Sequence, residues 1–207
     1  MIKKFLHEIY KLLGISLNLL YRAFWSVRDT FIKPKEKSIL FVAHPDDDVL
    51  FFHAFIKENK PYVVLLSDGW SLRRMSEFRT AMKRYGVKYR AYALNTRDTR
   101  IGLLEKYVMS SFKISKFERC ATHNSTGEYG HEMHIRVHNA VKKIAICDLY
   151  VPVNESDIIN YPLNDKNITE KIEMFKNVYY TQMFVLDMYE HWVKNEKLVK
   201  ADVNEKD

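Results

Sequence analysis

The chain has 207 residues, of which 47% are hydrophobic and 29% are charged, so it is long enough for one globular domain with a core and does not resemble a disordered polymer. Its two cysteines have neither a CxxC spacing nor the regular framework of disulfide-rich secreted domains, and we expect both to be reduced. Residues 1–36, with seven basic and three acidic side chains, contribute +4 of the formal charge of +7. No cationic stripe runs through the whole domain, which disfavours nucleic acid as a partner.

Residues 2–31 predict an amphipathic helix, because apolar residues such as Phe5, Ile9 and Leu13 recur near helical spacing with charges between them. The uncharged run Leu12–Tyr21 is shorter than the roughly 20 apolar residues that a spanning helix needs. Two interpretations stay open: residues 1–33 bind the surface of a membrane with anionic lipids, or this helix packs on the protein's own sheet. Both fit a cytoplasmic protein, with or without membrane association.

After residue 36, short apolar runs alternate with helical stretches. Strands are predicted at Ser38–Val42, Tyr62–Ser67, Lys88–Leu94, Phe117–Thr122 and Asp148–Val153, and helices at Val49–Lys57, Ser71–Tyr85, Leu103–Phe112, His131–Ile144 and about Ile168–Lys194. This alternation predicts an α/β fold with a mostly parallel sheet flanked by helices, and ligands bound beyond the carboxyl ends of the strands. We therefore expect an N-terminal helical segment (1–36), one domain (37–195) and a charged, solvated tail (196–207).

The first predicted strand leads directly into the segment Ala43-His44-Pro45-Asp46-Asp47-Asp48. Histidine and aspartate are ligands suited to zinc, and a further carboxylate nearby can act on water. Three adjacent acids cannot all bind one ion, so some of them must have other roles. The alternative is that this segment binds no metal: the three aspartates then cap a helix, and His44 lies in a turn.

The second group of histidines follows the fourth predicted strand, in the segment Thr122–His134. His131 and His134 are three residues apart and share one face at the start of the next helix. His138 lies a further turn along, which makes a zincin-like pair with His134 a rival ligand set. That rival is weak because Ile135 stands where a zincin has glutamate. We assign no role to His53, His123 and His191.

Together these motifs resemble the PIG-L/LmbE-like de-N-acetylases, zinc hydrolases with a Rossmann-like fold that act on N-acetylglucosaminyl compounds. The resemblance covers about residues 38–153 and rests on AHPDDD at 43–48, GEYGHEMH at 127–134, and RMSE at 74–77 with Ala81 and Tyr85-Gly86. It implies that Zn²⁺, or another divalent metal, is held by His44, Asp47 and His134.

The resemblance also implies the roles of four further residues. Asp46 would be the general base, and His131 the imidazolium that stabilises the oxyanion. Tyr129 would help to polarise the amide carbonyl, and Arg74 would contact the substrate. These roles suit amide hydrolysis, which needs activated water, a base and a donor to the developing oxyanion.

Several residues depart from the family pattern or have a simpler interpretation. Asp48 stands where the family usually has glutamate, and we expect it to support the site rather than to react. Arg74 and Glu77 can also form a solvated pair on a helix face, and Asp68-Gly69 a simple turn. Late apolar residues are expected in the core instead of around a cofactor; they are Met174, Phe175, Met183, Phe184 and Met188.

Two functions remain as hypotheses. The first is removal of the N-acetyl group from a GlcNAc-containing glycolipid, glycan or nucleotide sugar. The second is a membrane-surface or nucleic-acid binding protein on the same fold with a non-catalytic metal site. The patterns predict neither the acetyl carrier nor the oligomeric state.

Overall fold

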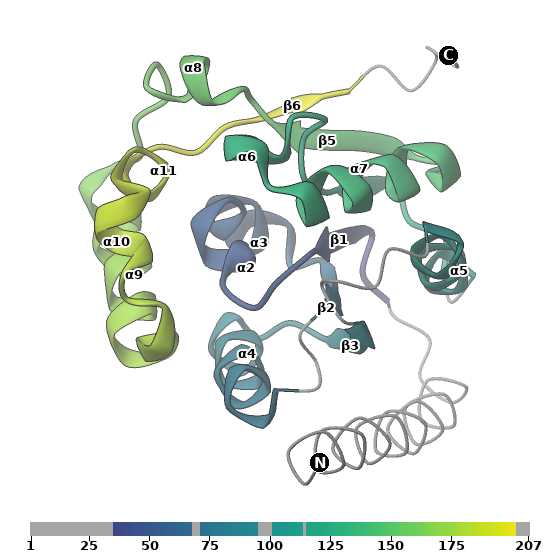
Figure 1. Ribbon diagram of the computed structural model, residues 1–207, viewed down its shortest axis with the longest axis horizontal. Coiled ribbons are helices and arrows are strands. Elements are labelled where there is room, and N and C mark those ends of the chain that lie inside the picture. Colours follow the sequence, from purple (N-terminus) through teal and green to yellow (C-terminus); the bar gives the residue numbers. More distant parts are fainter. Residues whose placement is uncertain (1–34, 68–70, 95–100, 114, 202–207) are drawn as a thin grey trace, which may run out of the picture. The chain divides into compact units, whose positions relative to one another are not determined.

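The computed structural model describes residues 35–67, 71–94, 101–113 and 115–201, and Figure 1 shows their arrangement. The predicted N-terminal helix, its membrane contact and the predicted turn at Asp68-Gly69 lie outside the described residues and stay predictions. No described helix has the length and apolar character needed to cross a membrane.

A six-stranded sheet with the order β3-β2-β1-β4-β5-β6 forms the centre of the domain. The strands are β1 (Ser38–Val42), β2 (Tyr62–Ser67), β3 (Tyr89–Leu94), β4 (Arg119–Ala121), β5 (Asp148–Pro152) and β6 (Leu198–Lys200). The first five pair in parallel, and β6 joins β5 in the antiparallel direction. This mostly parallel sheet confirms the predicted α/β fold class.

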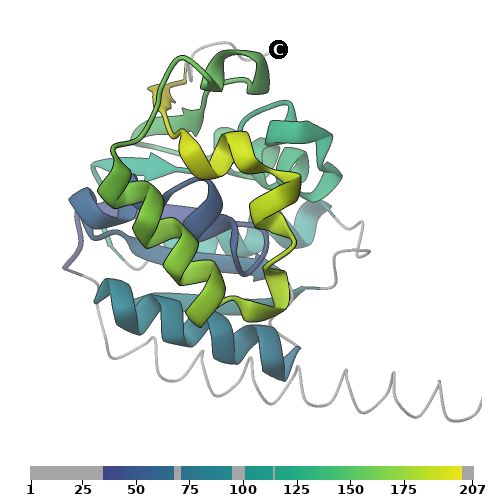
Figure 2. The ribbon, with the colours of Figure 1, turned by 90° about the vertical axis from the view of Figure 1, so that its left-hand side faces the viewer.

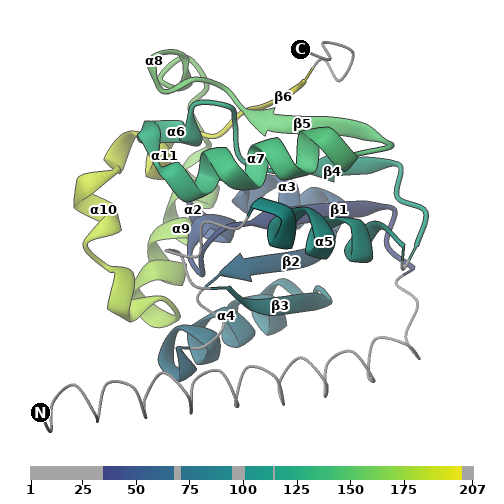
Figure 3. The same ribbon diagram turned by 45° about the vertical axis from the view of Figure 1, so that its right-hand side comes forward.

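Helices cover both faces of the sheet because its central strands are apolar on both sides; all five residues of β1 are buried. On one face lie α5 (Ile101–Phe112) and α7 (Glu132–Ile144), in front of the sheet in Figure 3. On the other lie α2 (Asp47–Leu50), α3 (His53–Asn59), α4 (Leu72–Tyr85) and α9 (Asp165–Asn177). Two short helices, α6 (Gly127–Gly130) and α8 (Glu155–Ile158), follow β4 and β5.

The long helix predicted for about 168–194 is wrong, because the chain there forms four short pieces that Figure 2 shows in front of the sheet. After α9 come η1 (Tyr180–Gln182), α10 (Val185–Met188) and α11 (Glu190–Lys194). The first break lets Tyr179 point inward and donate a hydrogen bond to Asp48, at 2.7 Å. The second falls at Tyr189, whose ring stacks on Tyr129 with centroids 4.3 Å apart. Tertiary contacts of two aromatic residues therefore override the helical pattern.

These breaks also change which late apolar residues are buried. Met174 and Phe175 lie in the core, as predicted. Met183, Phe184 and Met188 are 45%, 52% and 60% exposed, so their assignment to the core is wrong. The core assignment assumed one continuous helix, whose period would place these three side chains on the buried face. The turn at Val178 and Tyr179 interrupts that period, and the three side chains lie at the surface.

The domain also extends beyond the predicted boundary at 195. β6 is part of the sheet, and the buried carboxylate of Glu196 accepts the backbone N–H groups of Ala54 and Phe55 at 2.8 and 3.2 Å. Glu196 also pairs with Lys171, which is buried and donates to the carbonyl of Leu50. The segment 196–201 is therefore anchored to α3 and to the sheet instead of forming a solvated tail.

Candidate metal centre

The segment that follows β1 turns sharply into α2 and carries the first group of candidate residues. The backbone N–H of His44 donates to Asp47 Oδ2 at 2.7 Å, and the carbonyl of Asp46 accepts from Val49 and Leu50. Asp46 adopts a φ of 107°, a left-handed conformation that is rare for a residue with a Cβ. Its side chain does not cap α2, so helix capping does not account for this aspartate.

Three buried side chains from the two motifs meet at the carboxyl ends of β1 and β4. His44 Nδ1 lies 3.3 Å from His134 Nε2 and 3.5 Å from Asp47 Oδ2, while His134 Nε2 lies 3.4 Å from Asp47 Oδ1. A tetrahedral zinc ion with bonds of about 2.1 Å would separate its ligand atoms by about 3.4 Å. The spacing of the three side chains thus fits such an ion.

The hydrogen bonds of His134 fix which of its nitrogens faces this cluster. His134 Nδ1 lies 2.7 Å from Glu128 Oε2, and an ionised carboxylate can only accept, so the proton of the neutral ring is on Nδ1. Nε2 then presents its lone pair to the carboxylate oxygens of Asp47. Acceptors that converge on one another in a buried place are satisfied by a cation, which is the chemical argument for a metal here.

His123, for which no role was predicted, also lies in this cluster. Its ring stacks on that of His134 with centroids 3.9 Å apart, and its Nε2 lies 3.3 Å from Asp47 Oδ2. Burial lowers the pKa of His123, but the carboxylates of Glu128 and Asp47 outweigh it and raise this pKa to about 9. The N–H of Ala43 nevertheless donates to Nε2 at 3.0 Å, and a protonated ring could not accept this hydrogen bond, so the geometry favours a neutral ring. Its Nδ1 faces Glu128 at 3.1 Å, so both ring nitrogens are already engaged.

Two overlapping groups of side chains could hold an ion by proximity alone, since the donor atoms within each lie within 4.8 Å of one another. They are His44, His131 and His134, and Asp47, His123 and His134. Nδ1 of His131 accepts the N–H of Met133 at 3.2 Å, which leaves a proton on Nε2 of the neutral ring. His131 and His123 therefore offer no free lone pair, whereas Asp47 and Nε2 of His134 do, and Nδ1 of His44 lies 3.3 Å from that nitrogen.

The zincin-like pairing of His134 with His138 is wrong. His138 Nδ1 donates to the carbonyl of His123 at 2.8 Å, and His138 belongs to neither group of side chains that could hold an ion. The other two histidines without a role lie elsewhere: His53 is buried against the hydroxyl of Tyr85, and His191 pairs with Glu155 near the surface.

Asp46 and Arg74 lie together beside the cluster. Arg74 Nη2 contacts Asp46 Oδ1 at 3.0 Å and the carbonyl of Pro45 at 2.7 Å, so the alternative of a solvated pair with Glu77 does not hold. Glu77 is instead buried and accepts from the backbone N–H and the hydroxyl of Thr181. Burial, followed by the charge of Asp47, raises the pKa of Asp46 well above its usual range, and Arg74 only partly opposes this rise.

His131 lies at the edge of the cluster, with its ring centroid 4.5 Å from that of His134 and 4.7 Å from that of His44. Burial, followed by the neighbouring imidazoles, lowers the pKa of His131 to about 4. At neutral pH the ring is therefore uncharged and donates through Nε2. This protonation state differs from the imidazolium that the family resemblance implies.

Tyr129 lies against both the cluster and the C-terminal helices. Its ring centroid is 5.6 Å from that of His134 and 5.9 Å from that of His131, and Tyr189 stacks on its other side. Burial and the charge of Asp47 raise the pKa of Tyr129, so its hydroxyl keeps its proton and can donate.

Asp48 is bonded to the backbone of Asp46 and to Tyr179. One carboxylate oxygen accepts the hydroxyl of Tyr179 at 2.7 Å and the N–H of Asp46 at 3.2 Å, while the other has no hydrogen-bond partner among the described residues. Burial raises the pKa of Asp48 to about 7. The expected supporting role agrees with these contacts, and Tyr179 occupies space beside the shorter side chain.

Comparison with protein-family models gives no match, and comparison with curated protein sequences gives none either. Among solved structures, the chain is similar to GalB, the 4-carboxy-2-hydroxymuconate hydratase of Pseudomonas putida, with a TM-score of 0.53 and 13% identity over 75% of this chain and 82% of that one. A conserved protein of Thermus thermophilus, TT1542, matches with a TM-score of 0.49 and 13% identity over 79% of this chain and 94% of that one. At this identity, the likeness to GalB shows a shared fold and nothing finer.

Proposed function

We propose that this chain is a zinc-dependent hydrolase that removes the N-acetyl group from a GlcNAc-containing substrate. The observation that carries the proposal is the meeting of His44, Asp47 and His134 at ligand spacing, with the carboxylate of Asp46 beside them. The resemblance of the two motifs to the PIG-L/LmbE-like family supports the acetylated sugar as substrate. The fold shared with GalB agrees with an α/β enzyme whose site lies at the carboxyl ends of the strands.

A metal held by these three residues would supply a Lewis acid that makes water acidic and polarises an amide carbonyl. Asp46 would take the proton from the attacking water, and its raised pKa brings it closer to the range in which a general base works well at neutral pH. Arg74, bonded to the same carboxylate, orients it. After the attack, protonated Asp46 can return the proton to the leaving amine.

Two neutral donors would stabilise the oxyanion of the tetrahedral intermediate. His131 keeps a proton on Nε2 because its Nδ1 accepts the N–H of Met133. Tyr129 remains protonated at neutral pH and lies on the same side of His134 as His131. Neutral donors in a buried place can contribute strongly without a charge. In this proposal, His131 donates a hydrogen bond and does not protonate the amine.

The experiment is a measurement of acetate release over a panel of N-acetylated sugars, nucleotide sugars and glycolipids, with zinc supplied. Asp46→Asn should lower the turnover rate by about 10²–10⁴-fold while zinc is retained, because it removes the base and keeps the shape. Asp187→Asn changes an exposed aspartate on α10 and is the matched control. His134→Ala should lose bound zinc as well as activity.

The outcome also separates the enzyme from the rival hypothesis of a binding protein with an inert metal site. An inert site predicts zinc binding without acetate release from any member of the panel. Turnover by Asp46→Asn at the rate of the unmodified chain would show that the base is assigned wrongly.

We further propose that residues 1–33 contact a membrane surface, on the sequence pattern alone. Flotation with vesicles that contain anionic lipid should be stronger for the full chain than for a chain that starts at residue 34. Equal flotation of the two forms would remove this proposal and leave the enzymatic one intact.

A further inference from the structure

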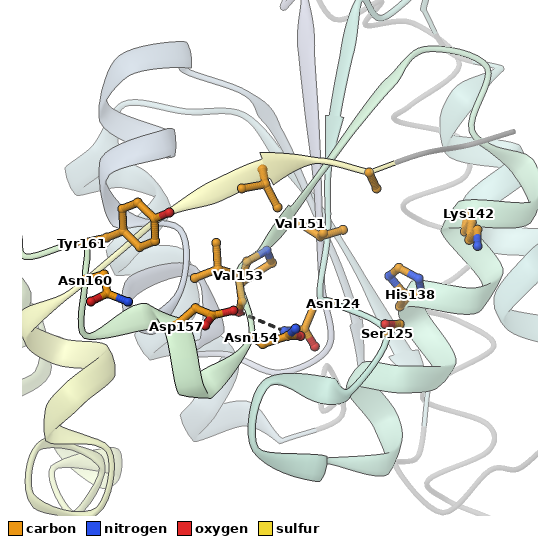
Figure 4. Close-up of a pocket in the computed structure, with 13 residues that line it drawn as sticks. Asn124, Ser125, His138, Lys142, Val151, Val153, Asn154, Asp157, Asn160 and Tyr161 are labelled. Atoms are coloured by element: carbon orange, nitrogen blue, oxygen red, sulfur yellow. Dashed lines mark hydrogen bonds between the residues drawn. The ribbon is translucent and has the colours of Figure 1, made fainter. Parts of the chain in front are cut away.

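A cavity of about 540 Å³ opens beyond the carboxyl ends of β4 and β5, and Figure 4 shows the side chains around it. This volume lies within the range of about 300–1,000 Å³ found for small-molecule sites. Three valines contribute to its apolar lining: Val151 on β5, Val153 directly after β5, and Val199 on β6. None of the three proposed metal ligands lines it. The cavity is thus a place at the same edge of the sheet that the proposed chemistry does not use.

His138 gives this cavity a hydrogen-bond acceptor. The side chain is 5% exposed, and its Nδ1 donates to the carbonyl of His123 at 2.8 Å. The neutral ring therefore carries its lone pair on Nε2, which has no hydrogen-bond partner among the described residues. This nitrogen is open to the cavity, and a ligand that donates a hydrogen bond could bind to it.

Five further polar side chains line the cavity, and no described residue forms a hydrogen bond or an ion pair with any of them. They are Ser125, Lys142, Asn154, Asp157 and Asn160. Ser125 and Lys142 lie near His138 in the view of Figure 4, whereas Asn154, Asp157 and Asn160 lie toward the other end. Asn154 begins α8 without capping it through its side chain, so its amide is available.

Asn124 also lines the cavity, but its side chain is fully engaged. Its Nδ2 donates to the carbonyl of Val153 at 3.2 Å, and its Oδ1 accepts the N–H groups of Thr126 and Glu128. The polar groups left for a ligand are therefore those of His138 and the five side chains named above.

The mixture of donors and acceptors selects the chemistry of the ligand. An anion would offer no hydrogen to His138 Nε2 and would be repelled by Asp157. An apolar molecule would leave the amides, the hydroxyl and the ammonium group without partners. Hydroxyl groups both donate and accept, and the C–H faces of a sugar ring can pack on the valines of the floor. We propose that this cavity binds a neutral sugar ring.

Tyr161 also lines the cavity, at the end formed by Asn160 and Asp157. The residue is 38% exposed, and Lys197 Nζ lies over its ring, 5.5 Å from the centroid. Aromatic rings at the edge of a polar pocket offer an apolar face together with a hydroxyl group. The proposal does not rest on deacetylation, since binding is measured directly and would hold for a chain without activity.

The test uses the full chain with Asp46→Asn, so that no probe is consumed. Glucose, galactose, N-acetylglucosamine and its β1,4-linked dimer are titrated to millimolar concentration, and the ¹⁵N signals of the His138 ring are followed by NMR. At least one of these sugars should shift the Nε2 signal of His138. Asn154→Ala and Asn160→Ala, both at exposed positions, should each weaken binding by about tenfold.

Asn177→Ala, at the end of α9 and outside the cavity, is the matched control and should leave binding unchanged. Glucose 6-phosphate should bind no more tightly than glucose. The proposal is overturned if no neutral sugar shifts the His138 signal, if the phosphorylated sugar binds more tightly than every neutral one, or if Asn177→Ala weakens binding as much as the cavity variants.

Discussion

Replacing Asp48 by asparagine should stabilise the metal-free chain at neutral pH. The side chain of Asp48 is fully buried, and burial raises its pKa from 3.8 to about 7 although Tyr179 donates to it. Its second carboxylate oxygen has no hydrogen-bond partner among the described residues. Asparagine keeps an acceptor for the Tyr179 hydroxyl and carries no charge, so it should fit the same place.

The magnitude follows from the pKa of Asp48 in the folded and the unfolded chain. Below pH 3.8 the group is protonated in both states and contributes no penalty. Between pH 3.8 and about 7 only the unfolded chain ionises, so stability falls by about 1.4 kcal/mol per pH unit. The total loss is about 4 kcal/mol, complete above pH 7. Asp48→Asn removes this dependence, so its advantage over the unmodified chain should grow by roughly that amount between pH 4 and pH 8.

Urea unfolding of both forms in a chelator, at several pH values over that range, measures this difference. Asp187→Asn, at an exposed position, should give a curve parallel to that of the unmodified chain. Tyr179→Phe removes the donor to the charged carboxylate and should raise the folded pKa further, so the loss of stability should begin at the same pH and continue to a higher one. Parallel curves for the unmodified chain and Asp48→Asn would refute the reasoning, because Asp48 would then titrate alike in both states.

Three further predictions concern named side chains. Glu128→Gln should weaken zinc binding by about 10–100-fold in a chelator competition, since it removes the carboxylate that orients His134. Gly127→Ala should lower the free energy of unfolding in urea by about 2 kcal/mol, more than Gly130→Ala does. Both glycines have positive φ, but only at 127 would a Cβ lie 2.9 Å from a neighbouring side chain. Phe175→Ala should cost about 3–5 kcal/mol, whereas Phe184→Ala at the surface should change stability by less than about 1 kcal/mol.

The strands could be predicted well because their signal is local. β1 and β2 have the predicted boundaries, Ser38–Val42 and Tyr62–Ser67, since each is a continuous apolar run that ends at polar or turn residues. The C-terminal helices could not be predicted in the same way. Their breaks depend on Tyr179 reaching Asp48 and Tyr189 reaching Tyr129, contacts between segments far apart in the sequence.

The candidate site follows a similar division. The meeting of His44 and Asp47 with His134 follows from their place after β1 and β4, because the carboxyl ends of adjacent parallel strands lie together. The same rule could have drawn attention to His123, which follows β4 even more closely. The neutral state of His131 could not be predicted, since it depends on the Met133 N–H and on nearby imidazoles that only the fold brings together.

Among the described residues, three non-glycine residues have positive φ, and two of them, Asp46 and Glu128, belong to the candidate site. Such a conformation costs about 1–2 kcal/mol for a residue with a Cβ, and glycine would avoid that cost. The carboxylates explain why glycine is absent: Asp46 reaches Arg74, and Glu128 bridges two imidazoles. We therefore expect Asp46→Gly to be more stable than Asp46→Ala by about 1 kcal/mol or more in urea, with both variants inactive. At an ordinary helical position glycine is the less stable of the two, so the usual order at 46 would contradict the idea that backbone strain is retained there for the sake of the carboxylate.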